Sequence, residues 1–216
     1  MAEAAAALAR LDEITRRLRR DCPWDREQDE RSIVPHTVEE AYELADAAES
    51  RDDAKLVDEL GDVLFQVLFL ALLLEERGAG SLTEVAEHCR RKLVRRHPHV
   101  FGRAGAAGSA GDAPTRLGDA RTAGEVVRNW SQIKRDEERG GEIFGQIPEI
   151  LPSTLYAKKV LKRAQSAGAT QPSGGEGHGE RLLEAVRVAV EAGVDPELEL
   201  RRAARRYREE VERGSA

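Results

Sequence analysis

The most apolar stretch of the chain, VLFQVLFLALLL at positions 63–74, follows directly after two acidic residues, Glu59 and Asp62. This stretch is too short to span a bilayer, and Glu75 and Glu76 close it, so we expect a buried core or interface helix rather than a membrane span. The two acids therefore lie at the edge of a core, where an uncompensated charge is disfavoured. Any fold of this chain has to compensate the charges of both carboxylates at that edge.

Apolar residues recur with helical spacing along most of the chain. Ala, Leu, Glu and Arg abound and aromatic residues make up only 4% of the sequence, which favours helices over sheets. No alternating strand pattern of useful length and no hairpin turn signal appears. We therefore predict an all-α fold with helices over residues 3–20, 37–49, 54–77, 81–96, 124–140, 153–167, 181–192 and 196–213.

Turn residues separate these predicted helices. We expect residues 21–25 to end the first helix and a loop to continue to about Pro35, with Thr37 capping the second helix and Glu40 three positions on. Ser81 is the predicted cap of the fourth helix, and Pro98 ends it. Residues 102–124 are rich in Gly and Ala without an apolar period, so we predict a flexible linker there.

The overall charge argues against a nucleic-acid partner, because the net charge is -6 and no basic excess is present. The two cysteines, Cys22 and Cys89, form no CxxC motif, and a reduced cytoplasm explains them more simply than a disulfide does. The N-terminus carries acids early and has helical apolar spacing, unlike a signal peptide. We expect a soluble cytoplasmic protein without a membrane segment.

Two pairs of acids share one spacing on neighbouring helices. Glu40 and Glu43 are three residues apart and lie on one face of the second helix, and Glu59 and Asp62 repeat the spacing on the third. A short turn joins these helices, so we expect them to pack antiparallel. That hairpin brings four carboxylates together.

Four clustered carboxylates repel one another and are costly beside an apolar run unless a cation is present. Oxygen ligands suit Mg²⁺ or Mn²⁺, and Mg²⁺ commonly bridges protein carboxylates to substrate phosphates and activates water. The alternative is a solvated helical hairpin with ordinary surface acids. A di-iron carboxylate bundle would need Glu-x-x-His, and none of the five histidines lies three positions after a glutamate.

Cations and tryptophans offer further contacts for a phosphorylated ligand. Lys92, Arg95 and Arg96 share a helical neighbourhood and suit phosphate oxygens, although cations at a helix C-terminus also complement the macrodipole. Trp24 and Trp130 can each stack on a base or fill a core, and Lys134 follows Trp130 by one turn.

Five segments, taken in order, resemble the MazG-type nucleoside triphosphate pyrophosphohydrolases. They are residues 22–25 (CPWD), 39–43 (EEAYE), 59–66 (ELGDVLFQ), 92–101 (KLVRRHPHVF) and 130–134 (WSQIK). The two acidic motifs alone are moderately specific, whereas the full ordered set is very specific.

The resemblance implies a helical-hairpin, four-helix-bundle core assembled as a homodimer. It implies Mg²⁺-dependent hydrolysis of nucleoside triphosphates to monophosphate and pyrophosphate, by water attack near the α-phosphorus, as nucleotide-pool housecleaning. The implied metal ligands are Glu40, Glu43, Glu59 and Asp62, with Glu39 acting from outside the ligand set. The implied nucleotide contacts are Lys92, Arg95, Trp130 and Lys134.

The resemblance also divides the chain. Residues 1–101 correspond to the catalytic domain, and a helix over 125–146 completes the nucleotide site. Long members carry a second acidic hairpin, but here QPSGGEGHGE (171–180) stands where its first helix belongs. Residues 147–216 therefore resemble a degenerate second copy without a metal motif.

Two alternatives stay open. The first is a narrower hydrolase of the same fold, acting on dUTP and dCTP or on phosphoribosyl-ATP, although the CPWD and HPHVF segments favour the MazG branch. The second is a catalytically silent helical interaction protein, against which the intact set of four acids argues.

Overall fold

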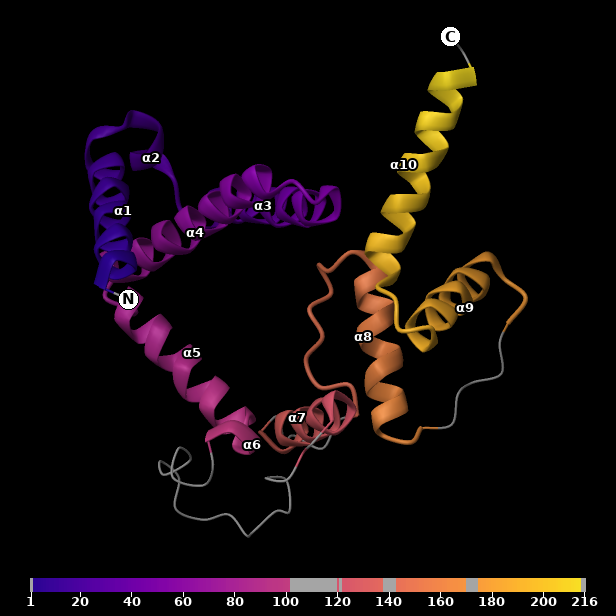
Figure 1. Ribbon diagram of the computed structural model, residues 1–216. Coiled ribbons are helices and arrows are strands. Elements are labelled where there is room, and N and C mark those ends of the chain that lie inside the picture. Colours follow the sequence, from indigo (N-terminus) through magenta and orange to yellow (C-terminus); the bar gives the residue numbers. More distant parts are fainter. Residues whose placement is uncertain (1, 102–119, 121, 138–142, 170–174, 215–216) are drawn as a thin grey trace. The chain divides into compact units, whose positions relative to one another are not determined.

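The computed structural model describes residues 2–101, 120, 122–137, 143–169 and 175–214, and within these ranges it is helical and contains no strand (Figure 1). The helices are α1 (Ala2–Asp21), α2 (Pro23–Glu27), α3 (Glu30–Ser50), α4 (Asp53–Glu76), α5 (Leu82–Arg96), α6 (Pro98–Phe101), α7 (Ala123–Glu137), α8 (Ser153–Ser166), α9 (His178–Glu191) and α10 (Pro196–Gly214). The predicted all-α fold is confirmed for these residues. The chain divides into two compact units, residues 1–112 and 113–216, which we describe separately.

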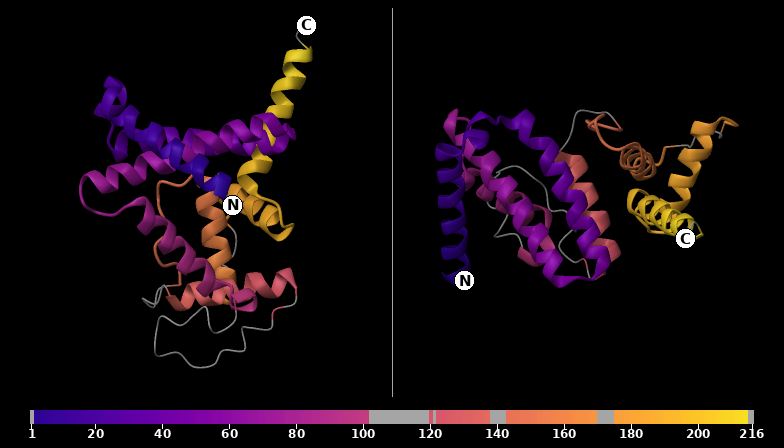
Figure 2. Two further views of the ribbon diagram at one scale, coloured as in Figure 1. Left: turned by 60° about the vertical axis from the view of Figure 1, so that its left-hand side comes forward. Right: turned by 90° about the horizontal axis from the view of Figure 1, so that it is seen from above.

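Helices α3 and α4 form the antiparallel hairpin that the acid spacing predicts, and they lie side by side in every view (Figures 1 and 2). The turn between them is tight because Arg51 takes a left-handed conformation, with φ of 56°. Asp52 then caps α4, since its side chain accepts hydrogen bonds from the backbone N–H groups of Ala54 and Lys55. This turn fixes how the acids of the two helices face each other.

The core of the first unit lies between these two helices. Ile33 of α3 and Phe69 and Leu73 of α4 are buried together, and Phe65 and Leu70 pack against them. The apolar run is therefore core, as predicted. None of the helices in the described ranges is long and apolar enough to cross a membrane.

The predicted loop up to Pro35 is wrong, because α3 begins at Glu30. Asp29 is the actual cap: its side chain accepts from the Ser32 N–H, and the Ser32 hydroxyl accepts from the Asp29 N–H in a reciprocal capping box. Pro35 lies inside the helix, where it removes one backbone hydrogen bond. The completed box and the burial of Ile33 outweigh that loss. Thr37 is therefore an interior residue of α3 rather than its cap.

The segment between α1 and α3 is also ordered rather than a loop. It contains the short helix α2, and Arg19 of α1 donates to the backbone carbonyls of Asp25 (2.6 Å) and Gln28 (2.9 Å). The same guanidinium pairs with Glu76 of α4. One side chain thus ties α1, α2 and α4 together.

The remaining helix boundaries agree with the prediction to within a few residues. Ser81 caps α5, as predicted, and Cys22 and Cys89 are free thiols. In the second unit, α8 is joined to the start of α10 by contacts of Lys158 with Asp195 and of Thr154 with Glu197. Nearly all of the predicted linker, residues 102–124, lies outside the described residues.

Candidate metal centre

The hairpin brings three glutamates to one point. Glu40 and Glu43 project from successive turns of α3, and Glu59 projects from α4 opposite them. Each offers a carboxylate oxygen, and these oxygens all lie within 4.8 Å of one another. Glu59 is buried, Glu40 is half-buried and Glu43 is exposed, so the cluster opens to solvent on the Glu43 side.

The electrostatics of the cluster show that its charges are unfavourable as they stand. Burial raises the pKa of Glu40, and the charges of Asp62, Glu43 and Glu59 raise it further. Burial also raises the pKa of Glu59, with Glu43 as the next contribution. Carboxylates with raised pKa values are held in a place that disfavours their charged form.

Positively charged side chains compensate the negative charge of the cluster only partly. Within the described residues, no lysine or arginine lies within salt-bridge distance of Glu40, Glu43 or Glu59. Lys55, one turn before Glu59, lowers the pKa of Glu59 but pairs instead with Asp46 at 3.1 Å. The three carboxylates thus share a space in which a divalent cation fits.

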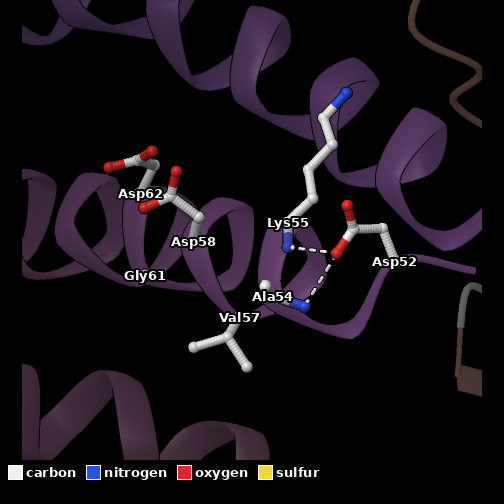
Figure 3. Close-up of a pocket in the computed structure, with 7 residues that line it drawn as sticks. All are labelled: Asp52, Ala54, Lys55, Val57, Asp58, Gly61 and Asp62. Carbon is white, nitrogen blue, oxygen red and sulfur yellow. Dashed lines mark hydrogen bonds between the residues drawn. The ribbon is translucent and has the colours of Figure 1, made fainter. Parts of the chain in front are cut away.

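Asp62 stands next to this group rather than within it. It lies one turn after Glu59 on α4 and is near enough to raise the pKa of Glu40, but its oxygens are not among those within 4.8 Å. Asp62 lines a neighbouring pocket of about 620 Å³ with Lys55, Asp58 and Gly61. In Figure 3 the carboxylates of Asp58 and Asp62 point the same way, while the Lys55 ammonium points away from them. The role of Asp62 as a metal ligand stays a prediction. The role of the exposed Glu39 outside the ligand set stays a prediction too.

A polar contact behind the cluster was not predicted. The Thr37 hydroxyl lies 3.2 Å from Oε1 of Gln66 and 3.3 Å from the Ile33 carbonyl oxygen. Gln66 is buried, and it follows Glu59 by two turns on the same face of α4. This contact joins α3 to α4 beside the acids and fixes their register. The sequence signal for this contact was Gln66, the single polar residue in the apolar run at positions 63–74.

Three of the predicted phosphate-binding cations lie on α5 rather than on the α3–α4 hairpin that carries the acids. Lys92, Arg95 and Arg96 occupy the last turns of α5, and Figures 1 and 2 show α5 leading away from the α3–α4 pair. Both Arg95 and Arg96 already have partners. Their role in substrate binding stays a prediction.

The two tryptophans lie in different units. Trp24 of α2 is 51% exposed and its ring contacts His36 of α3. Trp130 is half-buried in α7 of the second unit. Lys134 is on the same helix, and its side chain lies outside the described residues. The contribution of α7 to the site is therefore a prediction.

The fold and site define an all-helical protein in which carboxylates converge from two antiparallel helices, and such oxygen donors suit a hard divalent cation. Comparison with known proteins gives the family. The model of the MazG nucleotide pyrophosphohydrolase domain matches residues 28–101, the range that contains all four predicted ligands.

Three relatives extend this match. An uncharacterized 26.1 kDa protein of Streptomyces cacaoi is 39% identical over 212 residues, covering 95% of this chain and 81% of that one. The nucleoside triphosphate pyrophosphohydrolase/pyrophosphatase MazG of Thermotoga maritima is 31% identical over 234 residues, covering 96% and 85%. A nucleoside triphosphate pyrophosphohydrolase of Escherichia coli is 38% identical over 165 residues, covering 74% and 57%. The chain belongs to the MazG nucleotide pyrophosphohydrolase family, and it is an enzyme of the class that hydrolyses phosphoric anhydrides.

Proposed function

We propose that this chain hydrolyses nucleoside triphosphates to nucleoside monophosphate and pyrophosphate, with Mg²⁺ as its cofactor and Mn²⁺ as a substitute. Water adds to the α-phosphorus and pyrophosphate leaves. The observation that carries the proposal is the convergence of Glu40, Glu43 and Glu59 within 4.8 Å, without a paired lysine or arginine among the described residues.

The donor set fits the proposed ion. All the groups are carboxylate oxygens, which suit Mg²⁺ or Mn²⁺ rather than Zn²⁺, and the raised pKa values of Glu40 and Glu59 indicate a site that gains from positive charge. When bound, the ion neutralises phosphate charge and promotes the ionisation of water. Asp62 is proposed as the fourth ligand because its charge already acts on Glu40.

The remaining residues are proposed either to position the metal ligands or to hold the substrate. Gln66 and Thr37 fix the separation of the helices, so that the ligands are already in place before the ion binds. Lys92, Arg95 and Arg96 are proposed to bind phosphate oxygens, together with Lys134. Trp24 and Trp130 are proposed to contact the nucleoside.

We further propose that the enzyme is a homodimer joined through the outer face of α4. Val57, Leu60 and Val67 are 71%, 50% and 41% exposed, and with Leu64 they follow the spacing of a coiled-coil seam. This face lies opposite the one that packs on α3. Gly61 lies beside it, where an added Cβ would meet nothing within 4 Å. An interior helical glycine with open space around it suits the close approach of a second helix.

The C-terminal region is proposed to support this dimer or cover the active site without binding metal itself. Residues 171–180 contain no EExxE motif where the second acidic helix belongs. Truncation after residue 145 tests the supporting role. Loss of dimerisation or activity supports that role, and retention of both would remove it.

An assay for released pyrophosphate, with and without Mg²⁺, tests the proposed activity. The panel holds the canonical nucleoside triphosphates, dUTP, dCTP and phosphoribosyl-ATP. We expect Mg²⁺-dependent turnover of several nucleoside triphosphates. Turnover of only dUTP and dCTP, or of only phosphoribosyl-ATP, would favour the narrower alternative, and no turnover of any would favour a silent interaction protein.

A further inference from the structure

The side chain of Trp24 forms an aromatic corner with His36. The two ring centroids are 5.7 Å apart and the ring planes meet at 67°. Trp24 is 51% exposed, and the His36 side chain is 46% exposed. Each ring therefore leaves apolar surface open to solvent, although tryptophan usually buries most of its large surface.

The exposure of Trp24 does not come from a loosely held segment. The Trp24 carbonyl accepts a hydrogen bond from the Gln28 side chain at 2.9 Å, and Asp25 beside it is buried. Arg19 holds the carbonyls of Asp25 and Gln28 in place. The backbone around Trp24 is thus fixed by several hydrogen bonds while its ring is left outside the core. A rigid aromatic ring presented in this way is preorganised for a ligand.

The corner lies in line with the metal centre. His36 precedes Glu40 by four residues and Glu43 by seven, so the three side chains lie on one face of α3. One helical turn separates His36 from Glu40, about 6 Å along the axis. That is the scale of the sugar that separates the α-phosphate of a nucleotide from its base.

The charges around the corner select which part of a substrate binds there. The Glu39 carboxylate lies 3.9 Å from Nδ1 of His36 and is outside the group of acids proposed to hold the cation. Its uncompensated negative charge disfavours phosphate oxygens at the corner, whereas the flat and uncharged base of a nucleotide gains by stacking. The two ends of the face therefore suit the two ends of a nucleotide.

We propose that Trp24 and His36 form the base-binding subsite of this enzyme, with the base stacked in the corner while the triphosphate lies at the carboxylates. Neither residue acts on the reacting atoms. Both set the affinity for substrates that carry a base. This inference rests on the proposed function, because it takes the acidic cluster as the phosphate end of the site.

Two substrates that differ only in the base test the proposal, namely ATP and ribose 5-triphosphate. Their pyrophosphate release is measured with Mg²⁺ for the wild type and for W24A, W24F and H36A. Stacking of one base on an aromatic side chain corresponds to about a 5-fold to 150-fold change in binding. We expect W24A to raise KM for ATP by a factor in this range and to lower kcat/KM for ribose 5-triphosphate by a much smaller factor. We expect H36A to raise KM for ATP by a smaller factor than W24A does. W24F keeps most of the affinity for ATP.

The opposite results are equally clear. An equal fall in kcat/KM for both substrates in W24A would show that Trp24 only supports the fold. Unchanged kcat/KM for both substrates would exclude Trp24 from the site. Either result would overturn the subsite while leaving the proposed hydrolysis intact. Failure of the function itself appears separately, as wild-type enzyme that releases no pyrophosphate from ATP or from any other nucleotide.

Discussion

Glu40 of α3 and Glu59 of α4 place carboxylate oxygens within 4.8 Å of each other across the helical hairpin, although Glu59 is buried. Each of the two pKa values is raised, first by burial and then by neighbouring carboxylates. The fold thus holds these charges in an arrangement that costs stability when no cation is bound. Such an arrangement is typical of a site kept for function rather than for stability.

Replacing Glu59 with Gln removes a metal ligand and one repelling charge together. We expect E59Q to lower Mg²⁺-dependent turnover by at least about 100-fold while raising the unfolding temperature of the metal-free protein. The measurements are pyrophosphate release and thermal unfolding in EDTA. D53N is the matched control, because Asp53 is an exposed acid at the start of the same helix. Near-normal turnover in E59Q would exclude Glu59 as an essential ligand.

The stability of the metal-free protein should depend on pH through the same groups. The pKa of Glu59 in the folded state lies above its ordinary value of 4.5, so the folded state binds more protons than the unfolded chain just above that pH. This contribution to stability is full below about pH 4.5 and is lost as pH rises through the folded pKa. The stability difference between E59Q and wild type is therefore largest near neutral pH and shrinks below about pH 4.5. Urea unfolding in EDTA at several pH values measures it, and a difference independent of pH would contradict the account.

Gly61 tests the proposed dimer face. Alanine is favoured over glycine inside a helix by about 0.5–1 kcal/mol, and the single chain has room for the added methyl group. We expect G61A to weaken dimerisation and lower activity, even though it favours helix α4 itself. G179A is the matched control, because Gly179 of α9 also has nothing within 4 Å of an added Cβ. Sedimentation over a range of concentrations measures both variants, and identical dimerisation in the two would argue against a partner helix at Gly61.

Arg19 tests whether the Trp24 segment is held in place. R19A removes the hydrogen bonds to the Asp25 and Gln28 carbonyls, the pairing with Glu76 and the contact with the Phe69 ring. We expect a loss of about 2 kcal/mol in unfolding free energy and a higher KM for nucleotide. Arg20 is exposed and pairs with the adjacent Asp21, so R20A should cost less than about 0.5 kcal/mol. Equal effects of the two substitutions in urea unfolding would show that Arg19 has no special role.

The sequence was sufficient for the α3–α4 hairpin and for the convergence of Glu40, Glu43 and Glu59, because helical periodicity and a short turn fix both. It was not sufficient for the start of α3, since the Thr37–Glu40 pattern and Pro35 both favoured a later start than the observed one. Burial of Ile33 and the Asp29–Ser32 box decided the earlier start. The contact between Trp24 and His36 depends on the path of the chain through α2, which no local pattern encodes.

Direct observation of a bound ion tests whether the carboxylates of α3 and α4 hold a divalent cation. Mn²⁺ binding is followed by electron paramagnetic resonance for wild type, E40Q, E59Q and the D53N control. We expect wild type and D53N to bind Mn²⁺ and Mg²⁺ to displace it, whereas E40Q and E59Q bind Mn²⁺ much more weakly. Equal Mn²⁺ affinity in all four proteins would show that Glu40 and Glu59 are not metal ligands.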